Sequence, residues 1–456
     1  MTDQNGTTHS PETDAARRAY DQAPERERFA PGIALSGLLA EKGHYAEALA
    51  VLARIQPLAD SDFERAQVLQ RQGWIHLRQS QYDKAYYFLG EAMVKLGTHP
   101  DSLELFHVYH DLAWMSYRQG YLEKARNYSE GAQLVVRSMP LKNGRKVDEA
   151  KADLCHLMAL IAAASGDFDA SLAHLESERQ LRQAYDNPVK QASLCNKMSS
   201  VLQAKGQLRQ AREFQLQAQE LARRNGDDFR QAVSAKNLGE ICFSLGDLDA
   251  ADGHFQRAFE LSRTVGNQLG TIFAHAGTGR ILEARGQFAK AAEHFQEALK
   301  LARRIKSREL EYSVLVDLAE LSVAWDKPEE ASGLLESAET LANELDMPVS
   351  PRHVLVTARR CWISGDSAEV ARGRALLQEL LSRPLVIDDE EPVSIPELEI
   401  QAGGLLARIQ IARSDRAAAA ATLRRAAGTI EGFVRDLDET DRGRILALPW
   451  GREVLA

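Results

Sequence analysis

Apolar residues recur through most of the chain at the spacing of amphipathic helices, in paired segments separated by a short turn. Residues 231–244 and 248–264 are one such pair, and Gly246 stands between them. Apolar positions three and four residues apart form one face of a helix, and glycine suits a helix end that needs left-handed backbone geometry. Strand-like runs such as PLVIDD at Pro384 are short and isolated. The pattern therefore predicts an all-α chain of antiparallel helix pairs.

These helix pairs repeat with nearly constant phase. Successive turn positions are 37, 40, 46, 40, 40, 40, 40, 39 and 49 residues apart. The ten turn positions are Gly43, Ser80, Gly120, Gly166, Gly206, Gly246, Gly286, Asp326, Gly365 and Ser414. A fixed period of this length is typical of solenoids, in which each unit packs on its neighbours.

A small residue stands seven positions before every turn. These ten residues are Ser36, Gly73, Ala113, Ala159, Ser199, Gly239, Gly279, Ala319, Ala358 and Ala407. In seven units an alanine also follows five positions after the turn: Ala48, Ala85, Ala125, Ala211, Ala251, Ala291 and Ala331. Small side chains at equivalent positions predict a close approach of the two helices in each pair.

The clearest copies resemble the tetratricopeptide repeat, a helix–turn–helix unit. The resemblance rests on Leu–Gly at Leu238 and Gly239, on Gly and an aromatic at the turn, and on Ala and Phe in the second helix, as at Ala251 and Phe255. It covers residues 29–428. The period of 40 is similar to that of the spindle-orientation adaptors, kinesin light chains and bacterial Rap-type peptide-responsive regulators. The resemblance implies a right-handed α-solenoid of about ten stacked helix pairs.

The ends and two irregular joints divide the chain further. Residues 1–28 are polar and are expected to form a mobile tail. Breaks in the repeat are expected near 138–147 and 382–397, where proline, glycine and a DDEE run interrupt the helical pattern. Residues 429–456 are predicted to form a capping helix and tail. The alternative is that 445–455 docks on another copy of the chain, which would make a homo-oligomer.

Composition and charge narrow the function classes. The chain has 456 residues, 44% of them apolar, with a net charge of −9, which argues against a nucleic-acid partner. Neither a long apolar run nor a signal-peptide pattern is visible in the sequence, so no membrane insertion and a cytoplasmic location are expected. Runs rich in alanine and arginine, such as RSDRAAAAATLRRAAG, suggest a bacterial source.

Sequence motifs for catalysis, phosphate binding or metal binding are lacking, so an enzyme is the least favoured class and no cofactor is expected. Cys155 and Cys195 occupy equivalent positions in adjacent units and are expected to be core thiols. His107 and His110 lack a convincing third ligand for a metal.

An aromatic stripe is the first candidate binding feature. His107, His110, Trp114 and Tyr117 follow a spacing that places them on one helix face, and Trp74 has the phase of Trp114. In the resembled family the first helix of each unit lines the concave surface. The stripe is either a cradle for a ligand side chain or packing against the next helix, and both interpretations stay open.

Polar residues on the predicted first helices are the second candidate feature. They are Arg71, Asn196, Lys197, Lys236, Asn237, Glu240, Arg280, Glu283, Asp317 and Glu320. The resemblance implies that Asn, Lys and Arg at such places hold the backbone or carboxylates of a bound segment, for which their donors are suited. The full two-carboxylate clamp of the co-chaperone type is not reproduced. The alternative is a solvated helix face with internal charge pairs.

Two function hypotheses follow. The first is a non-catalytic interaction scaffold that binds a peptide or helical segment of a partner protein in the concave groove. The second is a signal-responsive regulator, similar to Rap-type or sensor arrays, whose conformation changes when a small peptide or effector binds.

Overall fold

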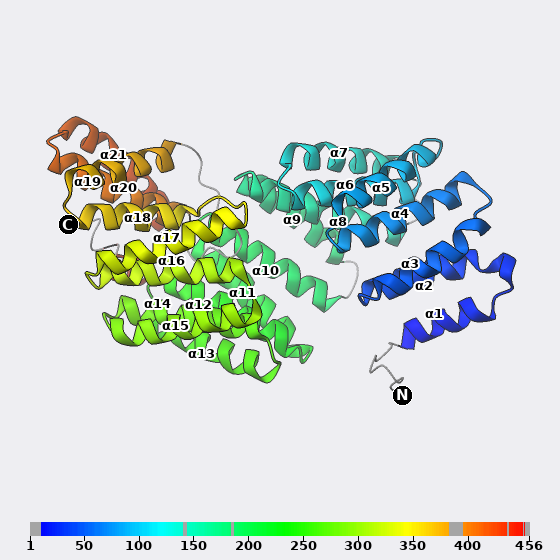
Figure 1. The fold of residues 1–456 in the computed structure, drawn as a ribbon, viewed down its shortest axis with the longest axis horizontal. Helices are drawn as coiled ribbons and strands as arrows, with labels where there is room; N and C mark the ends of the chain where they lie inside the picture. The colour runs from blue at the N-terminus through cyan, green and yellow to red at the C-terminus, as the bar shows by residue number, and fades with distance from the viewer. Residues whose placement is uncertain are drawn as a thin grey trace. The chain divides into compact units, whose positions relative to one another are not determined.

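The protein is all-α, as the sequence predicts. The computed structural model describes residues 11–139, 144–183, 187–382, 395–435, 437–449 and 451 (Figure 1). Within these ranges the chain forms 22 α-helices and two short 3-10 helices, and no strand. Part of the first predicted joint, residues 140–143, and most of the second, residues 383–394, lie outside the described residues.

Ten consecutive helix pairs follow one another along the chain. The pairs are α2 (Phe29–Glu41) with α3 (Tyr45–Ile55), α4 (Asp62–Arg78) with α5 (Tyr82–Leu96), α6 (Leu103–Arg118) with α7 (Leu122–Ser138), α8 (Gly144–Ala164) with α9 (Phe168–Gln183), α10 (Pro188–Ala204) with α11 (Leu208–Arg224), α12 (Asp228–Ser244) with α13 (Leu248–Thr264), α14 (Gln268–Ala284) with α15 (Phe288–Ile305), α16 (Arg308–Ala324) with α17 (Pro328–Glu344), α18 (Pro351–Ile363) with α19 (Ser367–Ser382), and α20 (Ile395–Ala412) with α21 (Arg416–Val434). Helices α1 (Pro11–Gln22) and α22 (Glu439–Ala447) flank them, and the short helices η1 (Glu25–Glu27) and η2 (Gln56–Leu58) lie near the start.

The ten predicted turn positions all adopt left-handed backbone geometry. Their φ angles lie between 57° at Ser80 and 82° at Gly43. Seven of the ten are glycine, which adopts this geometry without a steric penalty. The other three, Ser80, Asp326 and Ser414, adopt the same geometry with a short polar side chain. The register predicted from the sequence is therefore confirmed in every pair.

The small position of each unit is buried against the second helix of the pair. A Cβ atom added to Gly239 would lie 2.9 Å from the ring of Phe255, and one added to Gly279 would lie 2.7 Å from that of Phe295. All ten small residues are buried, and the seven alanines of the second helices have no exposed surface. A larger side chain at these positions would separate the two helices, which explains why the sequence keeps them small.

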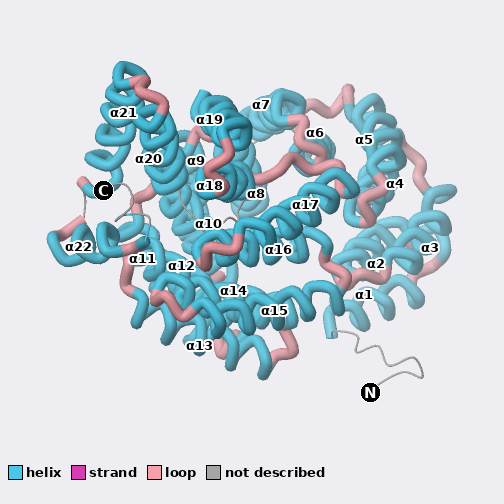
Figure 2. The backbone as a smooth tube through the Cα atoms, turned by 60° about the vertical axis from the view of Figure 1, so that its left-hand side comes forward, coloured by secondary structure: helices cyan, strands magenta, loops and turns pink. Residues whose placement is uncertain are grey.

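The chain forms two compact units, residues 1–165 with 173–184, and residues 166–172 with 185–456. Within the second unit the first helices of successive pairs, α12, α14, α16, α18 and α20, pack against one another in order (Figure 2). The second helices instead pack against the first helix on each side, as α13 does against α12 and α14. In a curved array the more closely packed row lies on the inside. We call the side formed by these first helices the inner face.

The start of the chain differs from the sequence-based expectation of a mobile tail. Residues 11–22 form helix α1, which packs against α2. Thr13, Ala16 and Tyr20 lie along one side of α1, and Tyr20 is buried in the same apolar cluster as Phe29 and Ile55. The apolar stripe is short and interrupted by charged residues, so composition alone hides it. Residues 1–10 lie outside the described residues.

The C-terminal helix α22 packs on the same unit's own turns. Phe433, Leu437 and Ile445 share an apolar cluster with residues of α10, α11 and α12. The predicted boundary at 428/429 falls inside α21. The described residues of this segment pack on their own array, residues 452–456 lie outside them, and docking on another copy of the chain stays a prediction.

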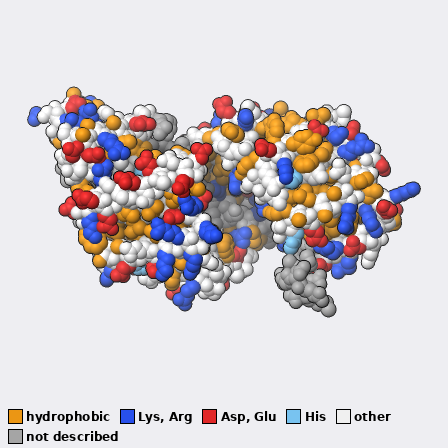
Figure 3. Space-filling view, viewed as in Figure 1, with side chains coloured by type: hydrophobic (Ala, Val, Ile, Leu, Met, Phe, Trp, Pro, Cys, Tyr) orange, Lys and Arg blue, Asp and Glu red, His pale blue; other side chains and the backbone are white. Residues whose placement is uncertain are grey.

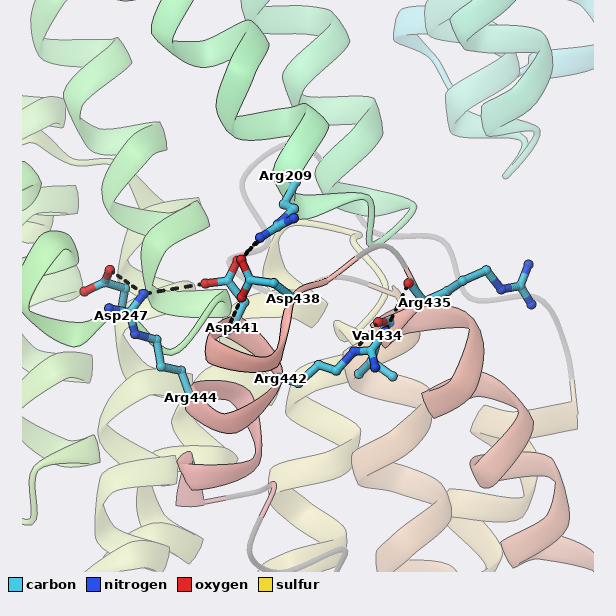
Figure 4. Close-up of polar contacts among 8 residues, drawn as sticks. All are labelled: Arg209, Asp247, Val434, Arg435, Asp438, Asp441, Arg442 and Arg444. Carbon is cyan, nitrogen blue, oxygen red and sulfur yellow. Dashed lines mark hydrogen bonds and ion pairs between the residues drawn. The ribbon is translucent and has the colours of Figure 1, made fainter.

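Ion pairs surround this apolar contact (Figure 4). Arg209 on α11 pairs with Asp438 and also reaches Asp441 at 3.2 Å. Arg444 on α22 lies 3.0 Å from Asp247, the residue that caps α13. The backbone approach is close, since a Cβ on Gly246 would lie 2.6 Å from the Arg444 carbonyl. The segment that closes the chain is therefore held by both burial and charge.

Candidate functional site

The face of the molecule drawn in Figure 3 carries acidic and basic side chains that are interspersed rather than gathered by sign. In the described part of the chain, no helix is long and apolar enough to cross a membrane. The same residues contain no group of three or more His, Cys, Asp or Glu side chains placed to hold a metal ion. The candidate sites are therefore polar and aromatic groups on the first helices.

In the first unit, Trp74 on α4 lies between two arginines. The guanidinium carbons of Arg71 and Arg78 lie 5.9 and 6.0 Å from its ring. Cation–π contacts of this length are favourable and hold the arginines over the ring. Trp74 also packs against the apolar cluster of α2 and α3. The predicted Arg71 and Trp74 thus come together, with one side of the indole used for packing.

The predicted stripe on α6 has mixed roles. Trp114 and Tyr117 have ring centroids 5.8 Å apart, and both pack against Leu157 and Ile161 of the next pair. His110 stacks on Phe106 at 5.7 Å, whereas His107 is exposed. Trp114 and Tyr117 therefore serve at least partly as packing residues, which is the second of the two interpretations. His107 is the member of the stripe most exposed to solvent.

In the second unit an amide cluster joins α10, α11 and α12. Gln215, which is fully buried, donates to the Asn196 side-chain oxygen at 2.7 Å and accepts from Asn237 at 3.4 Å. Asn196 and Asn237 are both half-buried, as is Lys197 next to Asn196. The structure brings the two predicted asparagines together through a residue of the second helix that the sequence analysis did not select.

Further along the inner face, charged side chains form what we call the ion network. Its members lie on α12, α14, α16 and α18: Lys236, Glu240, Arg280, Glu283, Asp317, Glu320, Arg352 and Arg359. Lys236 lies 3.0 Å from Glu240. Arg352 reaches Asp317 at 2.6 Å and Glu320 at 2.5 Å, and Arg359 reaches Glu320 at 2.9 Å. Gln401 on α20 accepts from Arg359 at 2.7 Å and extends the network to a fifth first helix.

Arg352 and Arg359 were missed by the sequence analysis, although the repeat contains a signal for one of them. The residue directly after the small position is Glu240, Arg280, Glu320 and Arg359 in four successive units. These residues alternate in sign, which is what a ladder of ion pairs along one face requires. Following this single phase through the array would have found Arg359. Arg352 has no such repeated phase.

The pKa values of two glutamates of the ion network, Glu283 and Glu320, are shifted in opposite directions. Burial, together with the neighbouring Glu320 carboxylate, holds the pKa of Glu283 well above its ordinary value, so Glu283 retains a proton where an ordinary glutamate is ionised. Burial also acts to raise the pKa of Glu320, but Arg352 and Arg359 outweigh it and lower that pKa. Glu283 keeps some accessible surface in spite of its crowded surroundings. Glu320 is therefore the ionised partner of the two arginines.

Comparison with known protein families agrees with the repeat geometry. Residues 225–372 match the MalT-like TPR region, and residues 192–225 match the tetratricopeptide repeat. The repeats within residues 192–372 match the tetratricopeptide repeat. None of the curated proteins matches the chain in sequence. The matched residues 225–372 include every member of the ion network.

Solved structures of similar fold have low sequence identity to this chain. A Rap protein complexed with competence and sporulation factor is 13% identical, with a TM-score of 0.56, over 82% of this chain and 99% of that one. The Rap conjugation gene regulator of plasmid pLS20, in complex with the Phr* peptide, is 14% identical, with a TM-score of 0.54, over 82% and 96%. The apo quorum sensor NprR from B. thuringiensis is 11% identical, with a TM-score of 0.51, over 79% and 96%. At this identity the likeness establishes the fold.

Proposed function

We propose that this protein is a non-catalytic binding protein that takes up a peptide or an extended segment of a partner protein on the inner face of its second unit. The observation that carries the proposal is the convergence of polar side chains from successive first helices, α12 to α20, on that one face, together with the amide cluster that joins α10 and α11 to α12. Amide and charged groups in such a row suit the main chain and side chains of an extended segment. Two of the similar structures hold a bound factor or peptide, which supports the same class of ligand.

The amide cluster is the proposed contact for the ligand main chain. Asn196 and Asn237 are half-buried and lie on neighbouring first helices. An amide both donates and accepts, so it pairs with a peptide main chain without selecting one side chain. The Gln215 side chain holds both asparagines in place, because it bonds to each of them.

A direct test is affinity selection of a pooled library of short random peptides by the full-length chain, read out by mass spectrometry. We expect a set of peptides to be retained, and Asn237→Ala with Lys197→Ala to reduce their retention. Arg257→Ala on the exposed side of α13 is the matched control and should retain the same set. Failure to retain any peptide would reject the proposed function, and equal retention by both variants would place the binding surface elsewhere.

A signal-responsive regulator is the second candidate. The observation that favours it is the contact of α22 with the turns after α10 and α12. The polar side of this contact consists of partly exposed ion pairs, and a change in the curvature of the helix array would break them. Small-angle scattering of the chain with and without a retained peptide distinguishes the two candidates. A changed radius of gyration supports the regulator, and an unchanged one supports the scaffold.

A further inference from the structure

The outer row of helices in the first unit carries a group of exposed apolar side chains. In this unit the first helices α2, α4, α6 and α8 pack against one another in order, which leaves α5 and α7 on the outside. Each member of the group has more than half of its surface exposed. The members are Tyr86, Tyr87 and Val94 on α5, Leu134 on α7, and Tyr121 directly before α7. We call this group the outer apolar surface.

The repeat register shows that Val94 and Leu134 are exceptional. Each stands fourteen residues after the turn of its unit, at Ser80 and Gly120. In the six units that follow, the same position holds a polar or charged residue: Gln180, Glu220, Glu260, Lys300, Thr340 and Glu379. Val94 is nevertheless 80% exposed and Leu134 is 65% exposed. An exposed position that is polar in six units is thus apolar in these two, and a contiguous exposed apolar patch marks an interaction site.

Tyrosines complete the outer apolar surface. Seven of the eleven tyrosines of the chain lie between residues 82 and 128. Tyr86 on α5 and Tyr128 on α7 are joined by a side-chain hydrogen bond, which links the two helices across this surface. Tyrosine offers a large contact area with few rotatable bonds, so covering it with a partner costs little conformational entropy.

We propose that the outer apolar surface binds the same surface of a second copy of the chain. The three tyrosines alone expose on the order of 350 Å², because an aromatic side chain carries about 150 to 250 Å². Val94, Leu134 and the polar residues around them bring the total closer to the area of about 800 Å² that each partner buries in a stable interface. A symmetric dimer uses one patch twice, so a single surface is sufficient. The proposal does not depend on peptide binding by the second unit.

Charged residues at the ends of α5 and α7 favour an antiparallel second copy. Asp83 lies in the first turn of α5 and Arg137 in the last turn of α7, and both are exposed. Lys84 is also exposed, but one residue further along turns its side chain about 100° round the helix. When α5 of one copy lies antiparallel on α7 of the other, Asp83 comes opposite Arg137. Three residues inward on each helix, Tyr86 then comes opposite Leu134, so the surface complements itself in charge and in apolar contact.

Sedimentation velocity of the full-length chain at about 1 to 100 µM tests the proposal. We expect a concentration-dependent dimer for the wild type. Val94→Gln with Leu134→Gln should weaken its association about tenfold or more, because both substitutions bury an amide in the interface. Glutamine occupies the same register position at Gln180, so the helices still form, which circular dichroism checks.

Leu216→Gln is the matched control, because Leu216 is also an exposed leucine but lies on α11 of the second unit. This variant should associate as strongly as the wild type. A wild type that stays monomeric at every concentration would overturn the proposal and leave the surface to a different protein. Equal association of the wild type and the double variant would overturn it as well.

A charge-reversal experiment tests the antiparallel arrangement. Asp83→Lys and Arg137→Glu each place like charges opposite each other in a homodimer, so each variant alone should associate several-fold more weakly than the wild type. A mixture of the two variants has opposite charges at both contacts and should recover the wild-type association. Association in the mixture that is no stronger than that of either variant alone would overturn the antiparallel pairing.

Discussion

Arg444 on the last helix lies 3.0 Å from Asp247, at the turn between α12 and α13, although the two residues lie far apart in the sequence. The Arg444 side chain is 42% exposed, so this pair contributes less than about 1 kcal/mol to stability. Ile445, the next residue, is 1% exposed and lies in the apolar cluster under α22. The ion pair thus defines where α22 docks, and the apolar residues supply most of the docking free energy.

Ile445→Ala should therefore lower the free energy of unfolding by about 2 to 4 kcal/mol, because it removes buried methyl groups and leaves a cavity. Leu446→Ala is the matched control, since Leu446 is 36% exposed and adjacent in sequence, and it should change stability by less than about 0.5 kcal/mol. Urea unfolding followed by circular dichroism measures both. Equal effects of the two substitutions would show that α22 does not dock as described.

A glycine pair tests the packing of the repeat itself. Gly279→Ala places a Cβ 2.7 Å from the buried ring of Phe295, and we expect a loss of about 1 to 3 kcal/mol from overpacking. Gly253→Ala, in the exposed interior of α13 with no atom within 4 Å of the new Cβ, should stabilise by about 0.5 to 1 kcal/mol. Thermal unfolding of both variants is the measurement. Stabilisation by both would mean that the helices of the α14–α15 pair separate easily.

The repeat register was predictable because it depends on backbone geometry that few residues tolerate. A left-handed turn and a close helix contact restrict the residue type strongly, so Gly246 and Gly239 carry the phase visibly in the sequence. The ladder position after the small residue was also present in the sequence. It was overlooked because charged residues on helix faces usually point to solvent.

Other features depend on contacts that no local pattern records. Tyr20 is buried only because α2 and α3 complete its cluster, and Ile445 only because the turns after α10 and α12 lie beneath it. Arg352 joins the network through Asp317 and Glu320 on the preceding first helix. These contacts follow from the curvature of the array, which the sequence period does not specify. The selected residues lie on the first helices, as the repeat pattern predicts, whereas their contact partners cannot be read from the sequence.

The cysteines should be slow to react in the folded protein. Burial raises the pKa of Cys155, Cys242 and Cys361 to about 11, so almost none of these thiols is ionised at about pH 8, and the thiolate is the reactive form. Ellman's reagent should label them slowly in the native protein and rapidly in denaturant. Fast labelling of the native chain at any of these three positions would contradict the burial of that helix.

Glu283 should make stability depend on pH in a defined direction. Its pKa is raised in the folded chain by burial and by Glu320, so the folded state holds a proton that the unfolded state releases above the ordinary glutamate range. Stability contributed by this group is present at low pH and is lost as pH rises towards the folded pKa. Asp317, Arg352 and Arg359 also face this carboxyl, and their charges set how far the decline extends.

Glu283→Gln keeps a neutral side chain of the same shape at every pH and removes this contribution. The variant should gain stability relative to wild type as pH rises from about 5 to about 8, and the difference should shrink towards the acidic end. Urea unfolding midpoints measured across that range provide the test. Glu336→Gln, on the exposed side of α17, is the control for a carboxyl lost from the surface. A difference between Glu283→Gln and wild type that stays constant over the whole range would show that Glu283 is ionised in the folded protein, and the ion network would then hold one more negative charge beside Arg280.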